Sequence, residues 1–232
     1  MPNPPPSERD QPTPMPPLFV VGCDRSGTTL LTALLESRLD LVAPLETHFI
    51  PYFAKTLFLW GNLQNRHNRK RLLTEIYHFL EILLVKNYPQ KERASIRHAT
   101  LLATLSHFDT ILESASSFGE LIRGLFAHFA AYHNKRGWVD NSSFYESISL
   151  ETWQEHLPDM KVIHIVRDGR DVVLSWLRSW WGPATLGEAA SLWQTHVTDK
   201  RAWGARHPDQ YLEVRYEHLL DDPETVLRQI AG

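Results

Sequence analysis

The sequence has 232 residues, 43% of them hydrophobic and 22% charged, and a formal net charge of −3. This length is enough to bury a substantial core in one domain, and the small net charge argues against a nucleic-acid partner. The single cysteine, Cys23, excludes an internal disulfide and favours a reducing, cytoplasmic location. No apolar run reaches the roughly eighteen residues of a membrane-spanning helix, so no membrane span is expected.

Residues 1–17 are rich in proline and poor in apolar side chains, which predicts a disordered leader rather than a signal peptide. Residues 18–21 (LFVV) are a short apolar run closed by Gly22, as in a buried parallel strand. Residues 28–37 then repeat leucines at helical spacing. A strand, a loop and a helix in this order open an α/β domain, which we expect to cover residues 18–232.

A long helical stretch, residues 49–136, follows and is expected to be a helical insertion over the sheet. Within it, Ser117 and Glu120 have the spacing of a capping box, as do Thr185 and Glu188 further on. Strands are predicted at residues 137–140, 161–166 and 210–214. Helices are predicted at residues 149–156, 168–180 and 185–206, and from Asp222 onward. This alternation predicts a parallel sheet flanked by helices and joined by right-handed crossovers.

The segment from Gly22 to Thr29 (GCDRSGTT) has the Gly-x4-Gly spacing of a phosphate-binding loop, between a predicted strand and a predicted helix. Its glycines let backbone N–H groups converge on an anion, and the helix N-terminus adds about half a positive charge. Thr28 and Thr29 add hydroxyl donors. Nucleoside triphosphatases carry a lysine after the second glycine, whereas this chain has Thr28 there and Arg25 as its cation. The loop therefore suits a 5′-phosphosulfate better than a triphosphate held with Mg²⁺.

A second phosphate contact is predicted where the strand at residues 161–166 ends. Arg167 follows this strand, and Ser175 lies eight residues later on the next predicted helix, so the two can hold one phosphate from two sides. The alternative is that Arg167 pairs with Asp168 and that Ser175 is an ordinary helix residue. The glycine-rich loop by itself has an equally simple alternative, an ordinary strand–helix turn. The two motifs together favour a nucleotide site.

The loop VGCDRSGTTLL resembles the 5′-phosphosulfate loop of sulfotransferases that use 3′-phosphoadenosine 5′-phosphosulfate (PAPS), most closely the tyrosylprotein sulfotransferases and many bacterial members. Arg167 and Ser175 resemble the family's 3′-phosphate motif, and residues 213–219 (EVRYEHL) are similar to a strand-end segment that puts Tyr216 near the nucleotide. The resemblance implies a P-loop-type fold with PAPS as co-substrate. The residues expected to contact the nucleotide are Arg25, Ser26, Gly27, Thr28, Thr29, Arg167, Ser175 and Tyr216.

The resemblance also implies the reaction, which is transfer of a sulfuryl group from PAPS to a hydroxyl or amine acceptor. Glu46 follows Arg25 at the separation of a base glutamate in the tyrosylprotein branch, so it is expected to be the general base, with Arg25 stabilising the leaving phosphate. A solvated Glu46 and a base role for His48 are the alternatives. No histidine or cysteine has metal-ligand spacing, so no metal is expected. The sequence does not identify the acceptor (a small molecule, a carbohydrate or a peptide) or the oligomeric state.

Two features depart from the family pattern. Asn141 stands where many relatives carry a lysine that helps to neutralise the leaving group. The chain also ends at Gly232, where relatives usually continue with further nucleotide contacts, so we expect either a truncated C-terminus or a naturally short member. These departures keep two other functions open: a P-loop kinase or nucleoside triphosphatase, and a nucleotide-binding remnant without activity.

An aromatic-rich set follows the 3′-phosphate motif. Its tryptophans are Trp176, Trp180, Trp181, Trp193 and Trp203. Aromatic residues at helical spacing are expected mainly in the core. Some of these indoles could instead line an acceptor cleft, where an aryl ring or a sugar would stack.

Overall fold

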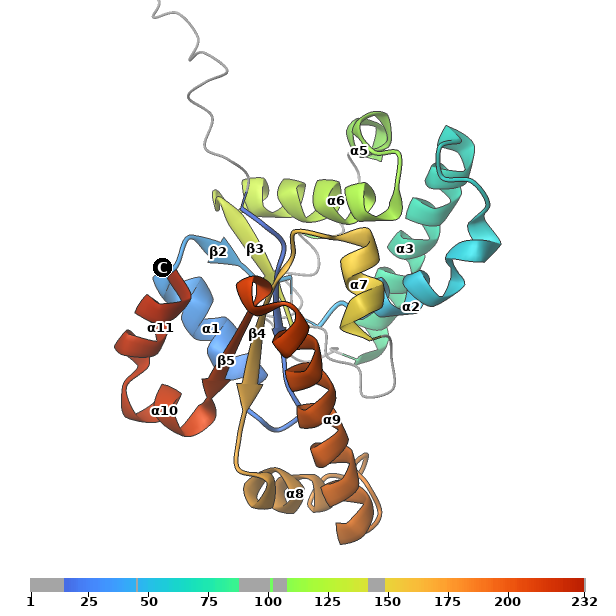
Figure 1. Ribbon diagram of the computed structural model, residues 1–232. Coiled ribbons are helices and arrows are strands. Elements are labelled where there is room, and N and C mark those ends of the chain that lie inside the picture. The colour runs from blue at the N-terminus through green and yellow to red at the C-terminus, as the bar shows by residue number, and fades with distance from the viewer. Residues whose placement is uncertain (1–14, 45, 88–100, 102–107, 142–148, 232) are drawn as a thin grey trace, which may run out of the picture.

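A computed structural model describes residues 15–44, 46–87, 101, 108–141 and 149–231, without the side chains of residues 83–87 and 108 (Figure 1). Most of the predicted leader, residues 1–14, lies outside the described residues. The described chain forms an α/β structure in which one sheet is flanked by helices on both faces.

The described sheet has five strands, and every neighbouring pair is parallel, as predicted. Their order across the sheet is β2-β3-β1-β4-β5. The strands are β1 (Leu18–Val21), β2 (Leu41–Val42), β3 (Gly137–Asp140), β4 (Lys161–Val166) and β5 (Tyr211–Arg215). The sequence did not predict β2, because two apolar residues are too few to show a strand period.

The strand register brings the ends of the central strands to one edge of the sheet. Val21, the last residue of β1, pairs with His164 of β4, and Val166 at the end of β4 pairs with Arg215 at the end of β5. The loop after β1 and the segments after β4 and β5 therefore meet at the same edge. In open α/β sheets, ligands bind at the carboxyl ends of the strands.

Helices cover both faces of the sheet (Figure 1). Between the strands lie α1 (Thr28–Arg38), α2 (Phe49–Thr56), η2 (Leu57–Trp60), α3 (Arg66–Asn87), α5 (Phe108–Ser114), α6 (Phe118–Tyr132), α7 (Leu150–His156), α8 (Gly169–Leu177), α9 (Leu186–Arg206) and η3 (Pro208–Gln210). After β5 come α10 (Tyr216–Asp221) and α11 (Pro223–Ala231). The elements from α2 to α6 occupy the region of the expected helical insertion.

Alternating side chains of the strands divide the core in two. Phe19 and Val21 of β1 pack into one cluster with apolar residues of α2, α3, α6 and α7. Val20, the residue between them, packs into a second cluster with α1, β5 and α11. Successive strand residues point to opposite faces, so a strand buried on both faces reads as a continuous apolar run.

Both predicted capping boxes are confirmed. The hydroxyl of Ser117 accepts the backbone N–H of Glu120 at 3.2 Å at the start of α6. The hydroxyl of Thr185 accepts the N–H of Glu188 at 3.2 Å at the start of α9. These caps depend on residues three positions apart, which is why the sequence alone was sufficient to predict them.

The helices differ from the prediction in two places, the end of α8 and the segment directly after β5. Helix α8 begins after Asp168, whose side chain accepts the N–H of Arg170 at 2.9 Å, but it ends at Leu177 rather than at Trp180. Past this end the N–H of Ser179 donates to the Trp176 carbonyl at 2.8 Å, which begins a turn. The predicted last helix does start after Asp222, as α11, whereas the six-residue helix α10 was missed.

Candidate active site

The loop after β1 depends on two glycines. A Cβ on Gly22 would lie 2.7 Å from the Ile165 carbonyl oxygen, so only glycine lets the loop approach β4 this closely. Gly27 has φ 97°, and a Cβ there would lie 2.4 Å from the ring of Tyr216. Gly27 is also the N-cap of α1, so the first-turn N–H groups of that helix open directly from the loop.

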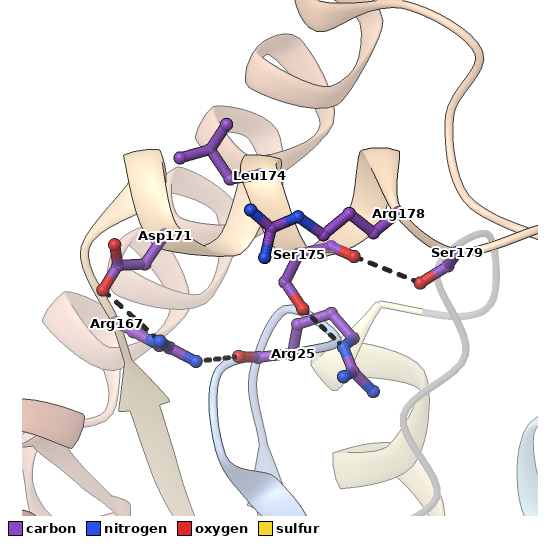
Figure 2. A pocket seen from close by; sticks show the side chains of 7 residues that line it. All are labelled: Arg25, Arg167, Asp171, Leu174, Ser175, Arg178 and Ser179. Carbon is purple, nitrogen blue, oxygen red and sulfur yellow. Dashed lines mark hydrogen bonds and ion pairs between the residues drawn. The ribbon is translucent and has the colours of Figure 1, made fainter.

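Arg25 stands at the tip of this loop and connects the two predicted phosphate motifs. Its Nε donates to the hydroxyl of Ser175 on α8 at 2.9 Å (Figure 2). Its carbonyl oxygen accepts a hydrogen bond from Nη1 of Arg167 at 3.2 Å. Arg25 has φ 69°, a left-handed conformation uncommon for a residue with a side chain. The fold thus brings together three predicted site residues that are distant in sequence.

These three residues line a pocket of about 540 Å³ (Figure 2). Its lining residues are Arg25, Arg167, Asp171, Leu174, Ser175, Arg178 and Ser179. Three of the lining residues are arginines with a guanidinium group, and two are serines with a hydroxyl group. Such a lining suits a ligand with phosphate groups, because arginine and hydroxyl donors hold phosphate oxygens well.

Arg178 is a pocket residue that the sequence analysis missed. It lies three residues after Ser175, which is one helical turn, and Figure 2 shows its side chain next to that serine. The spacing from Ser175 was the available signal, since positions i and i+3 share one face of a helix.

Besides the Arg25 carbonyl, two side chains contact Arg167. Its guanidinium lies over the ring of Tyr216 with 4.6 Å between the guanidinium carbon and the ring centroid, and its Nη2 is 3.3 Å from a carboxylate oxygen of Asp171. Asp168 pairs with Arg170 at 2.6 Å, so the alternative in which Arg167 pairs with Asp168 is wrong. The hydrogen bonds from Arg170 lower the pKa of Asp168 to about 2. Tyr216 contacts the guanidinium of Arg167 through the face of its ring and is not one of the pocket-lining residues.

The remaining loop residues lie around the N-terminus of α1. Ser26 and Thr28 are buried, whereas Thr29 is exposed in the first turn of the helix. None of the three lines the pocket around Arg25. The hydroxyl of Ser26 is buried and forms no hydrogen bond with the described part of the protein.

Glu46 follows the carboxyl end of β2 and has a half-exposed side chain next to His48. A carboxylate oxygen of Glu46 is 3.9 Å from Nε2 of His48. Burial lowers the pKa of His48 to about 4, so this imidazole is neutral at pH 7. Neither residue lines the pocket that contains Arg25.

Asn141 comes directly after β3, the neighbour of β1 on the side away from β4. Its side chain is buried, and its Oδ1 has no hydrogen-bond partner within the residues that the structure covers. The amide therefore lies at the same edge of the sheet as the phosphate-binding loop, with one polar atom unsatisfied.

The described residues contain no group of three or more histidine, cysteine, aspartate or glutamate side chains placed to hold a metal ion. No helix in the ranges given above has both the length and the apolar character of a membrane span.

Comparison with known proteins identifies the family of this chain. The protein-family model described as "Sulfotransferase family" matches residues 16–232. The structure is similar to the sulfotransferase domain of the Synechococcus PCC 7002 olefin synthase, with 24% sequence identity, a TM-score of 0.58, and coverage of 95% of this chain and 73% of that chain. It is also similar to sulfotransferase STF1 from Mycobacterium tuberculosis H37Rv, with 20% identity and a TM-score of 0.48 over 93% of this chain and 66% of that chain. No curated protein matches the sequence.

The family match covers nearly the whole chain, and the first structural match shares its α/β fold. Both findings agree with the resemblance carried by the loop after β1 and by the segment after β4. The chain belongs to the sulfotransferase family, a family of enzymes that use PAPS.

Proposed function

We propose that this protein transfers the sulfuryl group of PAPS to a hydroxyl or amine of an acceptor molecule. The observation that carries the proposal is the pocket in which Arg25 of the loop after β1 meets Arg167 and Ser175 of the segment after β4. PAPS has one phosphate on its 3′ side and a phosphosulfate on its 5′ side. A site with two anion-binding halves fits this nucleotide.

Each half of the site has its own donors. Arg167, Ser175 and Arg178 would hold the 3′-phosphate between a strand end and helix α8. Ser26, Gly27, Thr28 and Thr29 would hold the 5′-phosphosulfate at the N-terminus of α1, where the helix dipole favours an anion. Tyr216 would keep the guanidinium of Arg167 in place through the contact between them.

The proposed chemistry is one in-line displacement. The acceptor oxygen forms a bond to sulfur while the bond between sulfur and the bridging phosphate oxygen breaks. The acceptor proton passes to Glu46, and Arg25 stabilises the negative charge that develops on the leaving phosphate. The released nucleotide is adenosine 3′,5′-bisphosphate (PAP).

Glu46 is preferred to His48 as the base on electrostatic grounds. Burial lowers the pKa of His48 to about 4, because protonation would create a charge on a buried imidazole, whereas protonation of Glu46 would neutralise a charge on a half-exposed carboxylate. Glu46 keeps a half-exposed carboxylate close to this ring. The proton could therefore reach Glu46 without creating a buried charge on the imidazole.

The proposed setting is a single domain formed by residues 18–232 in a reducing, cytoplasmic compartment. Cys23 is buried, and burial raises the pKa of its thiol above the ordinary range, so the group stays protonated. A buried, protonated cysteine that forms no disulfide is compatible with a reducing compartment. The acceptor is proposed to be a small molecule.

Calorimetry with PAP and with ATP tests the nucleotide assignment. PAP should bind without Mg²⁺, because backbone amides, arginines and hydroxyl groups are expected to meet both phosphates. Arg167→Ala should weaken PAP by roughly 30- to 150-fold, since a charge-assisted hydrogen bond contributes about 2–3 kcal/mol. The same variant should weaken adenosine 5′-phosphosulfate much less, because that ligand lacks the 3′-phosphate.

Two results would contradict this assignment. Tighter binding of ATP with Mg²⁺ than of PAP would indicate a nucleoside triphosphatase or kinase. Equal weakening of both adenosine ligands by Arg167→Ala would mean that Arg167 supports the fold and does not recognise the 3′-phosphate.

A further inference from the structure

The segment that contains η2 and the first turns of α3 differs in charge from the chain as a whole. The chain has a net charge of −3, whereas residues 47–74 contain no aspartate or glutamate. The same segment contains five basic residues, Lys55, Arg66, Arg69, Lys70 and Arg71. It is therefore a local concentration of positive charge on a protein that is negative overall.

The short helix η2 presents two apolar side chains to water. A 3₁₀-helix has three residues per turn, so Leu57 and Trp60 share one face of η2. Both are half-buried, and both pack against the larger core cluster. The two residues between them, Phe58 and Leu59, are 80% and 61% exposed. One face of η2 thus joins the core, and the other carries an aromatic and an aliphatic side chain on the surface.

Two contacts hold η2 and the turn after it against the start of α3. The guanidinium of Arg71 lies over the indole of Trp60, with 5.8 Å between the guanidinium carbon and the ring centroid. Nη1 of Arg69 donates to the Leu63 carbonyl at 2.6 Å. The exposed residues of η2 are therefore next to the basic first turns of α3, and the two sets belong to one surface.

The basic residues of α3 divide into two that support the fold and two that face water. Arg69 is buried, and Arg66 pairs with a carboxylate of α5 at 2.8 Å. Lys70 and Arg71 are exposed. With the two exposed residues of η2 they form a surface that we call the cationic-apolar patch. Its members are Phe58, Leu59, Lys70 and Arg71.

The composition of the patch selects the kind of partner that it fits. Surfaces that bind anionic membranes combine lysine and arginine with tryptophan, phenylalanine or leucine, because the cations meet the headgroups and the apolar side chains enter the layer below them. Interfaces between proteins are depleted in lysine, and an aliphatic side chain such as Leu59 cannot stack on a nucleobase. An anionic lipid surface therefore fits the patch better than an acidic protein or a single-stranded nucleic acid.

We propose that the cationic-apolar patch binds the surface of an anionic phospholipid membrane. Phe58 and Leu59 enter the boundary between headgroups and acyl chains, and Lys70 and Arg71 contact the headgroup phosphates. Such peripheral contact needs no membrane-spanning helix. Figure 1 shows α3 apart from α8, the helix that lines the nucleotide pocket, so membrane contact through the patch leaves the pocket open. Lipid binding at this surface is independent of sulfuryl transfer.

Cosedimentation with lipid vesicles tests the proposal. At low salt the wild-type chain should bind vesicles of equal parts phosphatidylcholine and phosphatidylglycerol, and it should bind uncharged phosphatidylcholine vesicles much more weakly. Lys70→Glu should weaken binding to the anionic vesicles by about 10- to 30-fold, because one attractive charge is lost and one repulsive charge is added. Phe58→Ser should weaken it by about tenfold or more, because the apolar area that enters the lipid is lost.

Two matched substitutions lie outside the patch. Trp180→Ser removes an aromatic side chain that is 95% exposed, and Arg228→Glu makes the same change of charge at an exposed position on α11. Both variants should bind the anionic vesicles like the wild type. Phe58→Ser and Lys70→Glu should keep the wild-type affinity for PAP, because neither residue lines the nucleotide pocket. Retained PAP binding also shows that these two variants are folded.

Four results would overturn the proposal. These are no binding to the anionic vesicles, equal binding to both kinds of vesicle, unchanged binding in Phe58→Ser or Lys70→Glu, and a loss of binding in Trp180→Ser that matches the loss in Phe58→Ser. Tighter binding to polyglutamate or to single-stranded DNA than to the anionic vesicles would assign the patch to another polyanion and would overturn the proposal as well.

Discussion

At the scale of single residues, Arg25 shows how the site is built. Its side chain bonds to Ser175, and its main chain accepts from Arg167. One residue of the loop therefore touches both residues that were expected to hold the 3′-phosphate. The contact also places a permanent positive charge between the two halves of the proposed nucleotide site, because arginine does not lose its proton in proteins.

The proposed base can be tested apart from binding with Glu46→Gln. The amide keeps the shape of the side chain and one acceptor oxygen, but it cannot take the acceptor proton. A positioned general base contributes about 10²–10⁴-fold, so turnover should fall by that order while PAP affinity stays nearly unchanged. Turnover is measured by mass spectrometry as sulfated product, with an alcohol taken from a panel of acceptors.

His48→Ala is the control for that experiment, and most of the activity should remain. If His48→Ala abolishes turnover while Glu46→Gln retains it, the base is His48. A Glu46 with only a structural role would show a lower melting temperature and a modest loss of rate in the glutamine variant.

At the scale of elements, the loop between β1 and α1 depends on Gly27. This glycine combines a left-handed backbone conformation with a close approach to the ring of Tyr216, which in turn lies under Arg167. A side chain at position 27 would therefore disturb the loop, the start of α1 and the support of Arg167 together. The loop, the first turn of α1 and the Tyr216 ring that contacts Arg167 therefore all depend on the absence of a side chain at Gly27.

Gly27→Ala should lower the melting temperature and weaken PAP. The left-handed conformation costs an alanine about 1–2 kcal/mol, before the clash with Tyr216 is counted, which corresponds to a shift of roughly 2–8 °C for a chain of this size. Gly187→Ala in α9 is the matched control, because a Cβ there meets nothing within 4 Å. That change should raise the melting temperature slightly, since alanine is the better helix former. Equal effects of the two substitutions would contradict the role assigned to Gly27.

At the scale of the whole molecule, a polar network links the buried His164 of β4 to partly exposed residues of β5 and α9. Nδ1 of His164 is 2.7 Å from the hydroxyl of Tyr211, and that hydroxyl donates to Glu213 at 3.2 Å. Since the carboxylate can only accept, the Tyr211 hydroxyl must accept a hydrogen bond from Nδ1 of His164. Arg201 completes the network with two hydrogen bonds of 2.7 Å to Glu213. Burial lowers the pKa of His164 to about 3.

Three histidines with strongly lowered pKa values should make the folded state sensitive to mild acid. Burial lowers the pKa of His48 and His196 to about 4 and that of His164 to about 3. In the unfolded chain each of these histidines would titrate near pH 6.5. Below that pH the unfolded state binds more protons than the folded state, so the free energy of unfolding decreases as the pH is lowered. The loss is about 1.4 kcal/mol per histidine for each pH unit between roughly 6 and 4.5.

Melting temperatures measured from pH 8 to pH 5 test this expectation. His196→Gln should reduce the steepness of the acid-side decline by roughly a quarter to a third, because one of the three most strongly shifted histidines is removed and the pKa of His156 is lowered as well. His67→Gln, at an exposed position on α3, is the control and should leave the decline as in the wild type. A flat profile down to pH 5 would show that these histidines are protonated in the folded protein.

The sequence by itself determined the features that depend on near neighbours. The strand at residues 18–21, the glycine-rich loop and the helix from Thr28 follow one another in a pattern that needs no tertiary information. The same is true of the caps at Ser117 and Thr185 and of the eight-residue separation of Arg167 and Ser175. Such features could be predicted because hydrophobic period, turn chemistry and capping act over a few residues.

Only the tertiary structure decided which distant residues meet. Arg25 and Ser175 are 150 positions apart, and the parallel register of β1 and β4 brings them to one edge of the sheet. The same packing buries Trp176 and exposes Trp180, although both belong to one aromatic-rich segment. It also leaves Glu46 outside the lining of the pocket that contains Arg25. Burial and contact are properties of the assembled sheet and helices, so no local pattern contains them.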